Sequence, residues 1–119
     1  YQTRDGSCIR DYIHVSDLAN AHCMALDHLR SNGQSRVFNC GYGKGFTVLE
    51  VIEAVKKASG IDFRVNLAAR RPGDPAELIA QSDRIRTELG WKPDYDNLDV
   101  IVRDALSWEE KLNGLSQAS

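Results

Sequence analysis

The stretch "RRPGDP" places two guanidinium groups and a carboxylate within five residues of one another. Pro72 and Gly73 suit the two central positions of a type II turn, which would hold Arg70 and Arg71 close to Asp74. A guanidinium offers a planar fork of donors that matches phosphate oxygens, and a carboxylate accepts hydrogen bonds from neighbouring sugar hydroxyls. Such a turn could bind a diphosphate and a ribose together. The alternative is a pair of arginines flanking a solvated surface turn.

A second group of charges interrupts the otherwise apolar stretch "RDYIHVSD". Arg10 and Asp11 stand next to each other there, and the alternation of a strand would place Arg10, Tyr12 and His14 on one side. This side could present a cation to a ligand. An edge strand with one solvated face explains the same pattern.

The glycine-rich stretch "GYGKGFTV", residues 41–48, follows an expected strand and precedes an expected helix, as a phosphate-binding loop does. Its spacing is GxGxG rather than GxGxxG, and Asp62 precedes the next expected strand instead of ending it. A P-loop would have Ser or Thr after its lysine, whereas Lys44 is followed by Gly45. The sequence therefore favours a tight structural turn over a dinucleotide loop.

The three histidines do not form a metal-binding pattern. His22 and His28 are separated by about 240 degrees around a helix with 3.6 residues per turn, so they cannot share a face. His14 is expected to pack or to form a hydrogen bond at the end of its strand. We therefore expect no metal site.

Composition is typical of one soluble domain. The chain has 119 residues and a net charge of −2, with 15 basic and 17 acidic residues and no long run of like charge, which argues against a nucleic-acid partner. No apolar stretch approaches the roughly 20 residues of a membrane span. The odd number of cysteines without a CxxC pair argues against a disulfide framework and fits a reducing cytoplasm: Cys8, Cys23 and Cys40.

Helical and extended patterns alternate along the chain, which predicts an α/β fold with few short strands and about four helices. We expect strands at 8–15, 36–40 and 63–69, a brief extended piece at 76–81, and helices at 18–30, 48–59, 83–89 and from 98 to about 112. Expected helix caps are Ser16 or Asp17, Thr47 with Glu50 as a capping box, Ser82 and Asn97. The start without Met suggests a piece of a longer protein.

Four blocks together carry a family resemblance: "DGSCIRDYIHVSDLANAH", "FNCGYGKGFTVLEVI", "ARRPGDPAELIAQSDRIRTELGWKP" and a final Trp-bearing helix. The chain closely resembles, from about Asp5 to Leu112, the C-terminal substrate-binding region of the UDP-glucose 4-epimerases in the extended short-chain dehydrogenase/reductase family. The "RDYIHVxD" and "RRPGDP" blocks are specific to this group. The resemblance implies that residues 1–119 form a UDP-sugar-binding domain, normally appended to a Rossmann domain that binds NAD.

The resemblance also implies roles for four residues. Arg10 and Arg71 would contact the diphosphate of a UDP-sugar, and Asp74 would hold the ribose hydroxyls. Leu78 matches a position in the wall of the sugar pocket, where side-chain size is associated with tolerance of N-acetylated sugars. Leucine is intermediate in size, so this position is compatible with either a plain or an N-acetylated sugar.

Enzymes of this group interconvert UDP-glucose and UDP-galactose, in galactose metabolism, by oxidising and reducing the sugar at C4 with tightly bound NAD. Their glycine-rich NAD loop and catalytic TyrxxxLys pair lie in the N-terminal region. No YxxxK occurs in this chain, so we expect no catalytic or NAD-binding residue in it and no turnover by the chain alone.

Three alternatives remain at the level of the sequence. One is a sibling activity in the same family, such as a nucleotide-sugar 4,6-dehydratase or a uronate epimerase. The others are a non-enzymatic nucleotide-sugar binding module and an α/β interaction domain. The parent protein could form a homodimer, and the chain alone would expose the face that meets the NAD domain, which predicts self-association.

Overall fold

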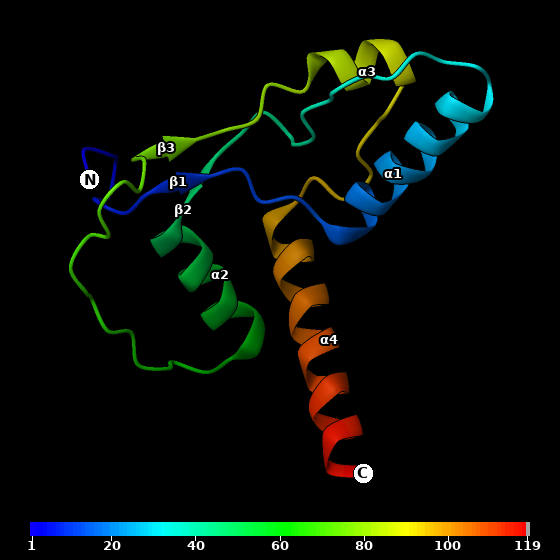
Figure 1. Ribbon diagram of the computed structural model, residues 1–119. Helices are drawn as coiled ribbons and strands as arrows, with labels where there is room; N and C mark the ends of the chain where they lie inside the picture. The colour runs from blue at the N-terminus through cyan, green and yellow to red at the C-terminus, as the bar shows by residue number, and fades with distance from the viewer. Residues whose placement is uncertain (119) are drawn as a thin grey trace.

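The computed structural model describes residues 1–118, with side chains described as far as residue 115. Within this range the elements are β1 (Ile9–Arg10), α1 (Val15–Arg30), β2 (Phe46–Thr47), α2 (Val48–Ser59), β3 (Glu77–Leu78), α3 (Asp83–Leu89) and α4 (Leu98–Ala118). α1 and α3 lie together at one end of the molecule, and the small sheet and α2 lie at the other (Figure 1). The predicted α/β class, with few strands and four helices, is confirmed.

The sheet has the strand order β2-β1-β3, with β1 antiparallel to β2 and parallel to β3. In the parallel pair, Ile9 lies opposite Glu77 and Arg10 lies opposite Leu78. Two residues to which the resemblance assigned binding roles are therefore neighbours across the sheet, although they lie 68 positions apart along the chain. The predicted extended piece at 76–81 is confirmed in its central part as β3.

The prediction of strands at 36–40 and 63–69 is wrong, because neither range forms a strand in the structure (Figure 1). An alternating apolar pattern favours an extended backbone, but a strand also requires a partner for its N–H and C=O groups. No partner strand accompanies either range in the part of the chain that the structure describes. Val37 and Leu67 are accordingly 80% and 88% exposed.

Two predicted caps of the helices are confirmed. Thr47 accepts a hydrogen bond from the Glu50 backbone N–H (3.1 Å), and the Glu50 carboxylate accepts one from the Thr47 N–H (2.8 Å), which completes the capping box of α2. At α4, the Asn97 side chain accepts from the Val100 N–H (3.2 Å). α2 ends at Gly60 in a left-handed conformation (φ 70°), which glycine adopts without strain.

Two other caps differ from the prediction. α1 begins at Val15, three residues before the expected start at residue 18, because His14 caps it: Nδ1 of His14 accepts the hydrogen bond from the Ser16 backbone N–H (3.0 Å). Ser82 does not cap α3, since its hydroxyl donates instead to the carbonyl of Gly41 (2.8 Å). The predicted strand at 8–15 shortens to two residues for a related reason: its second half turns to deliver His14 to the start of α1.

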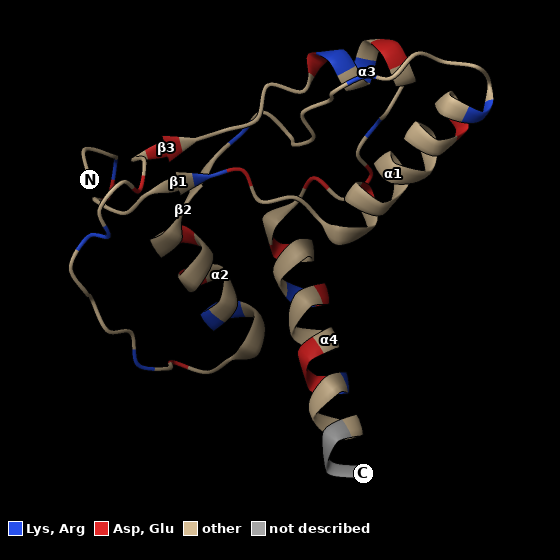
Figure 2. Cartoon of the chain, in the orientation of Figure 1, with Lys and Arg blue, Asp and Glu red and all other residues tan. Residues whose placement is uncertain are grey.

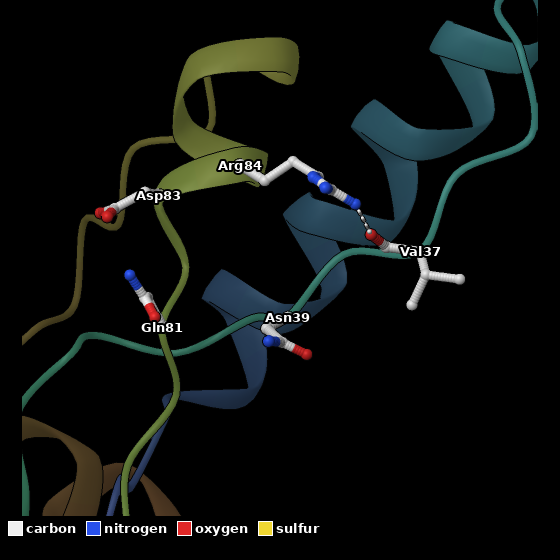
Figure 3. A pocket seen from close by; sticks show the side chains of 5 residues that line it. All are labelled: Val37, Asn39, Gln81, Asp83 and Arg84. Atoms are coloured by element: carbon white, nitrogen blue, oxygen red, sulfur yellow. Dashed lines mark hydrogen bonds between the residues drawn. The ribbon is translucent and has the colours of Figure 1, made fainter.

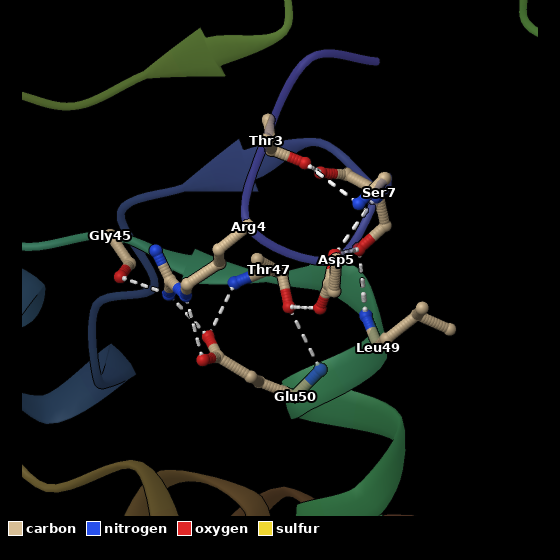
Figure 4. A network of polar contacts seen from close by, with 9 residues as sticks. Thr3, Arg4, Asp5, Ser7, Gly45, Thr47, Leu49 and Glu50 are labelled. Carbon is tan, nitrogen blue, oxygen red and sulfur yellow. Dashed lines mark hydrogen bonds and ion pairs between the residues drawn. The ribbon is translucent and has the colours of Figure 1, made fainter.

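A polar network fastens the N-terminal segment to the start of α2 (Figure 4). The Arg4 guanidinium forms an ion pair with Glu50 (2.5 Å), which lowers the pKa of that carboxyl group. Asp5 accepts a hydrogen bond from the Thr47 hydroxyl, and this bond lowers the pKa of Asp5. The Ser7 hydroxyl accepts from the Leu49 N–H (3.2 Å). Together these contacts hold the segment that leads into β1.

A buried aspartate joins α1 to the segment before α4. Asp17 is 2% exposed, and its carboxylate accepts from the Tyr42 hydroxyl (2.5 Å) and from the backbone N–H groups of Asp94 (2.8 Å) and Tyr95 (3.0 Å). Burial, and then the hydrogen bond to Asp17, raises the pKa of Tyr42, which keeps its hydroxyl a donor. These contacts surround the main apolar cluster, which consists of Ala21, Tyr42, Ile85 and Trp91.

The chain is more open than a compact domain of its length. Its radius of gyration is 17.3 Å, against about 13.5 Å expected for 119 residues. α4 packs on α2 through its first half, where Val102 is buried, whereas Trp108 further along is 53% exposed (Figure 1). Across the described residues, every helix falls short of the length and hydropathy that a bilayer crossing requires.

Replacement of Asp17 by asparagine tests the buried carboxylate. The amide nitrogen cannot accept the hydrogen bonds that one carboxylate oxygen accepts, so we expect the free energy of unfolding of the chain to fall by about 2–4 kcal/mol. Urea unfolding followed by circular dichroism measures this change. Asp27→Asn, on the exposed side of α1, is the matched control and should change stability by about 0.5 kcal/mol or less. Equal effects of the two substitutions would contradict the role given to Asp17.

Candidate functional site

The "RRPGDP" stretch forms the predicted turn. Gly73 adopts a φ of +77°, the value that a type II turn requires at its third position. The backbone N–H of Asp74 reaches the carbonyl of Arg71 (3.4 Å), which closes the turn. The turn directs Arg71 and Asp74 toward each other, so the sequence-based expectation for this turn is confirmed.

Asp74 lies at the centre of a polar cluster that gathers three parts of the chain. Its Oδ1 accepts from Arg10 Nη2 (2.6 Å), and its Oδ2 accepts from the Tyr1 hydroxyl (2.8 Å) and, at 3.4 Å, from Arg71 Nη2. The side chain of Asp74 is only 16% exposed. The hydrogen bond from Tyr1, followed by the charges of Arg10 and Arg71, lowers the pKa of Asp74. The carboxylate is thus ionised and can accept further hydrogen bonds.

The two arginines of the cluster differ in how firmly they are held. Arg10 projects from β1, and its guanidinium also donates to the carbonyls of Ile9 (2.7 Å) and Pro75 (2.9 Å). Arg71 is 84% exposed on the turn and has only the long contact to Asp74. Arg10 is therefore a fixed cation, whereas Arg71 can turn toward an arriving anion without losing a strong bond. Positive residues lie on β1 and on the segment between α2 and β3, with acidic residues beside them (Figure 2).

Leu78 lies next to the cluster through the sheet register. It pairs with Arg10 across β1 and β3 and is 60% exposed. Both residues line an open cavity of about 580 Å³, whose wall also includes Cys40 and Gln81. The four residues singled out from the sequence therefore surround one region: Arg10, Arg71 and Asp74 form the polar part, and Leu78 adjoins it.

Tyr1 also belongs to this region, although no local signal in the sequence indicates it. The Tyr1 ring lies under the guanidinium of Arg70, with 4.3 Å between the guanidinium carbon and the ring centroid. Arg70 also donates to the backbone carbonyl of Asp74 (3.0 Å). Tyr1 is 73 residues away from Asp74, so no spacing rule connects them. The predicted turn placed Arg70 close to Asp74, and the structure gives Arg70 contacts with both Asp74 and Tyr1.

The glycine-rich loop is occupied by a carboxylate of the chain itself. Asp11 accepts hydrogen bonds from the backbone N–H groups of Tyr42 (3.0 Å), Gly43 (2.9 Å) and Ala80 (3.3 Å). A phosphate would have to displace this carboxylate to use the same donors. The geometry therefore supports the structural interpretation of the loop. The edge-strand alternative for "RDYIHVSD" is wrong, because β1 lies between β2 and β3 in the sheet.

His14 has a structural role at the end of β1. Its Nε2 lies 2.7 Å from Asp104, and its ring stacks on Tyr95 with 4.5 Å between centroids. Because Nδ1 accepts from the Ser16 N–H, Nε2 carries the proton and donates to Asp104. Among the described residues, no group of three His, Cys, Asp or Glu side chains is placed to hold a metal ion.

A second pocket, of about 410 Å³, opens between the irregular segment before the glycine loop and the start of α3 (Figure 3). Arg84 spans it and donates to the Val37 carbonyl (3.5 Å). Asn39, Gln81 and Asp83 supply the remaining polar side chains. Arg84 is already directed at this backbone carbonyl and also pairs with Glu88 (3.4 Å), so this pocket suits an anionic ligand less well than the cluster around Asp74.

Comparisons with known proteins identify one matching family and several similar enzymes. The NAD dependent epimerase/dehydratase family matches residues 2–41. The UDP-glucose 4-epimerase of Azospirillum brasilense is 58% identical over 94% of this chain, and that of Halalkalibacterium halodurans is 55% identical over 93%. The chain resembles the UDP-glucose 4-epimerases along almost its entire length. It spans about one third of their length, 32% and 33% respectively.

Solved structures of epimerases show the same fold. The UDP-Glc/GlcNAc 4-epimerase of Campylobacter jejuni is 54% identical with a TM-score of 0.83, over 93% of this chain and 33% of that one. The UDP-glucose 4-epimerase of Bifidobacterium longum, solved with NAD+ and UDP, is 40% identical with a TM-score of 0.82, over 93% and 32%. The epimerase resemblance recognised from the sequence motifs is thereby confirmed.

Replacement of Gly41 by alanine tests the packing of the glycine-rich loop on β3. An added Cβ would lie 2.6 Å from the Ala80 Cβ and 2.7 Å from Asp11 Oδ2. We expect a loss of about 1–3 kcal/mol in the free energy of unfolding, measured by urea denaturation. Gly114→Ala is the control, because nothing lies within 4 Å there and alanine favours the helix by about 0.5–1 kcal/mol. A Gly41→Ala chain as stable as the Gly114→Ala chain would contradict the close packing.

Proposed function

We propose that residues 1–119 form the C-terminal, UDP-sugar-binding domain of a UDP-glucose 4-epimerase, an isomerase that interconverts UDP-glucose and UDP-galactose by NAD-dependent oxidation and reduction at C4. The observation that carries this proposal is the cluster of Arg10, Arg71 and Asp74 in a chain 58% identical to such an enzyme. The comparisons favour an epimerase over the sibling dehydratases and over a non-enzymatic module.

The cluster fits a nucleotide diphosphate in the following way. Arg10, held by β1 and the Pro75 carbonyl, presents a fixed positive charge. Arg71 leaves its long contact with Asp74 and turns to the diphosphate, where charge-assisted hydrogen bonds are stronger. Asp74 then accepts the ribose hydroxyls. The diphosphate and the ribose are bound side by side because the turn holds the arginine and the aspartate three residues apart.

Leu78 is proposed to border the sugar. Its place beside Arg10, on the wall of the same cavity, would bring a hexose attached to the diphosphate against its side chain. The Campylobacter jejuni enzyme, 54% identical, acts on UDP-Glc and UDP-GlcNAc. UDP-N-acetylglucosamine is therefore a substrate to test together with UDP-glucose.

NAD does not fit the residues of this chain. The one glycine-rich loop between an extended segment and a helix already binds the Asp11 carboxylate through its N–H groups. We therefore assign NAD and the catalytic Tyr and Lys to an adjoining N-terminal domain of the parent protein, and we expect the chain alone to be inactive. The relatives from Brucella ovis and Bifidobacterium longum were solved with NAD.

The open shape of the chain supports docking onto such a domain. Apolar side chains such as Val37 and Leu67 are largely exposed here, and burial against another domain would remove them from water. Without that domain, the same surface favours self-association. Three free thiols are consistent with the cytoplasm as the proposed compartment.

The direct test of the proposal uses the full-length protein that carries this chain. The purified protein is supplied with UDP-galactose and NAD, and UDP-glucose is measured by chromatography. Formation of UDP-glucose supports the epimerase assignment. Binding of UDP without formation of UDP-glucose would assign the protein to a sibling activity, and absence of UDP binding would contradict the proposed site.

Arg71→Ala tests the diphosphate contact in the same protein. Loss of one charge-assisted hydrogen bond is expected to weaken UDP binding by about 1.5–3 kcal/mol, a factor of about ten to 150, measured by isothermal titration calorimetry. Arg64→Ala, on the same irregular segment, is the matched control because Arg64 is exposed and lies outside the cluster. An affinity for UDP that is equal in both variants would contradict a phosphate contact of Arg71.

A further inference from the structure

Tyr1 and Arg70 form a closed triangle with Asp74. The Tyr1 hydroxyl donates to Asp74 Oδ2 (2.8 Å), the Arg70 guanidinium covers the Tyr1 ring (4.3 Å), and Arg70 Nη2 donates to the Asp74 carbonyl (3.0 Å). Each residue therefore contacts the other two. Neither Tyr1 nor Arg70 has a part in the diphosphate contacts described above.

We propose that Tyr1 is a positioning residue for the ribose contact, and that Arg70 in turn holds the Tyr1 ring in place. This inference rests on the proposed function, since it concerns how Asp74 meets the ribose. The hydroxyl of Tyr1 fixes the rotation of the Asp74 carboxylate, so that its remaining lone pairs point to a defined location. The Arg70 guanidinium lies over the face of the Tyr1 ring, and this cation–π contact favours the ring position that brings the hydroxyl to Asp74.

The hydrogen-bonding capacity of Asp74 agrees with this role. A carboxylate has about four lone-pair sites, two on each oxygen. Oδ1 uses one for Arg10, and Oδ2 uses one for Tyr1 and one for the long contact to Arg71. When Arg71 turns to a diphosphate, one site becomes free on each oxygen. Two vicinal ribose hydroxyls could then each donate to a different oxygen of the carboxylate.

The protonation states are also consistent. The hydrogen bond to Asp74 raises the pKa of Tyr1, so its hydroxyl remains a donor at neutral pH. The same bond lowers the pKa of Asp74, so its carboxylate remains an acceptor as the pH falls. Removal of the Tyr1 hydroxyl would therefore raise the pKa of Asp74, and acidification would protonate the acceptor at a higher pH.

The test compares UDP with 2′-deoxy-UDP in the full-length protein that carries this chain. Tyr1→Phe keeps the ring under Arg70 and removes only the hydroxyl. We expect it to weaken UDP binding about three- to ten-fold and 2′-deoxy-UDP binding less, so that the preference for the ribonucleotide falls. We also expect the affinity for UDP, measured as the pH is lowered, to begin to fall at a higher pH than in the unmodified protein. In an Asp74→Asn background, Tyr1→Phe should change UDP affinity little, because its partner carboxylate is gone.

Tyr95→Phe is the matched control, since Tyr95 is partly exposed and stacks on His14, away from the cluster. It should leave the affinity for UDP and the preference over 2′-deoxy-UDP unchanged. The positioning role alone would be overturned if the unmodified protein binds UDP normally and Tyr1→Phe changes neither the preference for UDP over 2′-deoxy-UDP nor the pH at which the affinity for UDP falls. Failure of the unmodified protein to bind UDP would overturn the proposed function as well.

Discussion

The ion pair between Arg10 and Asp74 is the contact on which the arrangement of this site depends. It joins groups 64 residues apart at 2.6 Å, and both side chains are largely shielded from water, with 23% and 16% of their surface exposed. Withdrawal of two charges from water is costly unless further hydrogen bonds satisfy their remaining donors and acceptors. Here Tyr1 donates to the carboxylate, and the carbonyl of Pro75 accepts from the guanidinium. The pair thereby fixes the turn beside β1, and the Ala76 carbonyl, two residues beyond Asp74, accepts from the Ile9 N–H (2.8 Å).

Carboxylates have a similar role elsewhere in the molecule. The strands contain only two residues each, so the sheet ladder supplies few hydrogen bonds between distant segments. Asp11 holds the glycine-rich loop and Ala80, two residues beyond β3, through backbone N–H groups, and Asp17 holds the segment before α4 in the same way. Asp5 accepts a hydrogen bond from the hydroxyl of Thr47, the cap residue of α2. Aspartate side chains thus connect segments that longer strands would connect in a larger sheet, which explains how the cluster around Asp74 is held in so open a chain.

The parts that could be predicted from the sequence are those with local causes. The capping box at Thr47 and the turn at Gly73 follow from residue types at fixed spacing, and both are present. The strands at 36–40 and 63–69 could not be predicted correctly, because their pattern specifies an extended backbone but not a partner. The role of Asp11 could not be predicted, because its three N–H partners lie 31 or more residues away. Tyr1 was missed for the same reason, since its contact with Asp74 exists only in the folded chain.

The central claim is that Arg10, Arg71 and Asp74 form one nucleotide-diphosphate site. A crystal structure of the full-length protein with UDP tests it most directly. The account predicts phosphate oxygens within hydrogen-bonding distance of both Arg10 and Arg71, and ribose hydroxyls on Asp74 with the Arg71 contact to that carboxylate released. UDP bound elsewhere, for example at the glycine-rich loop with Asp11 displaced, would contradict the account.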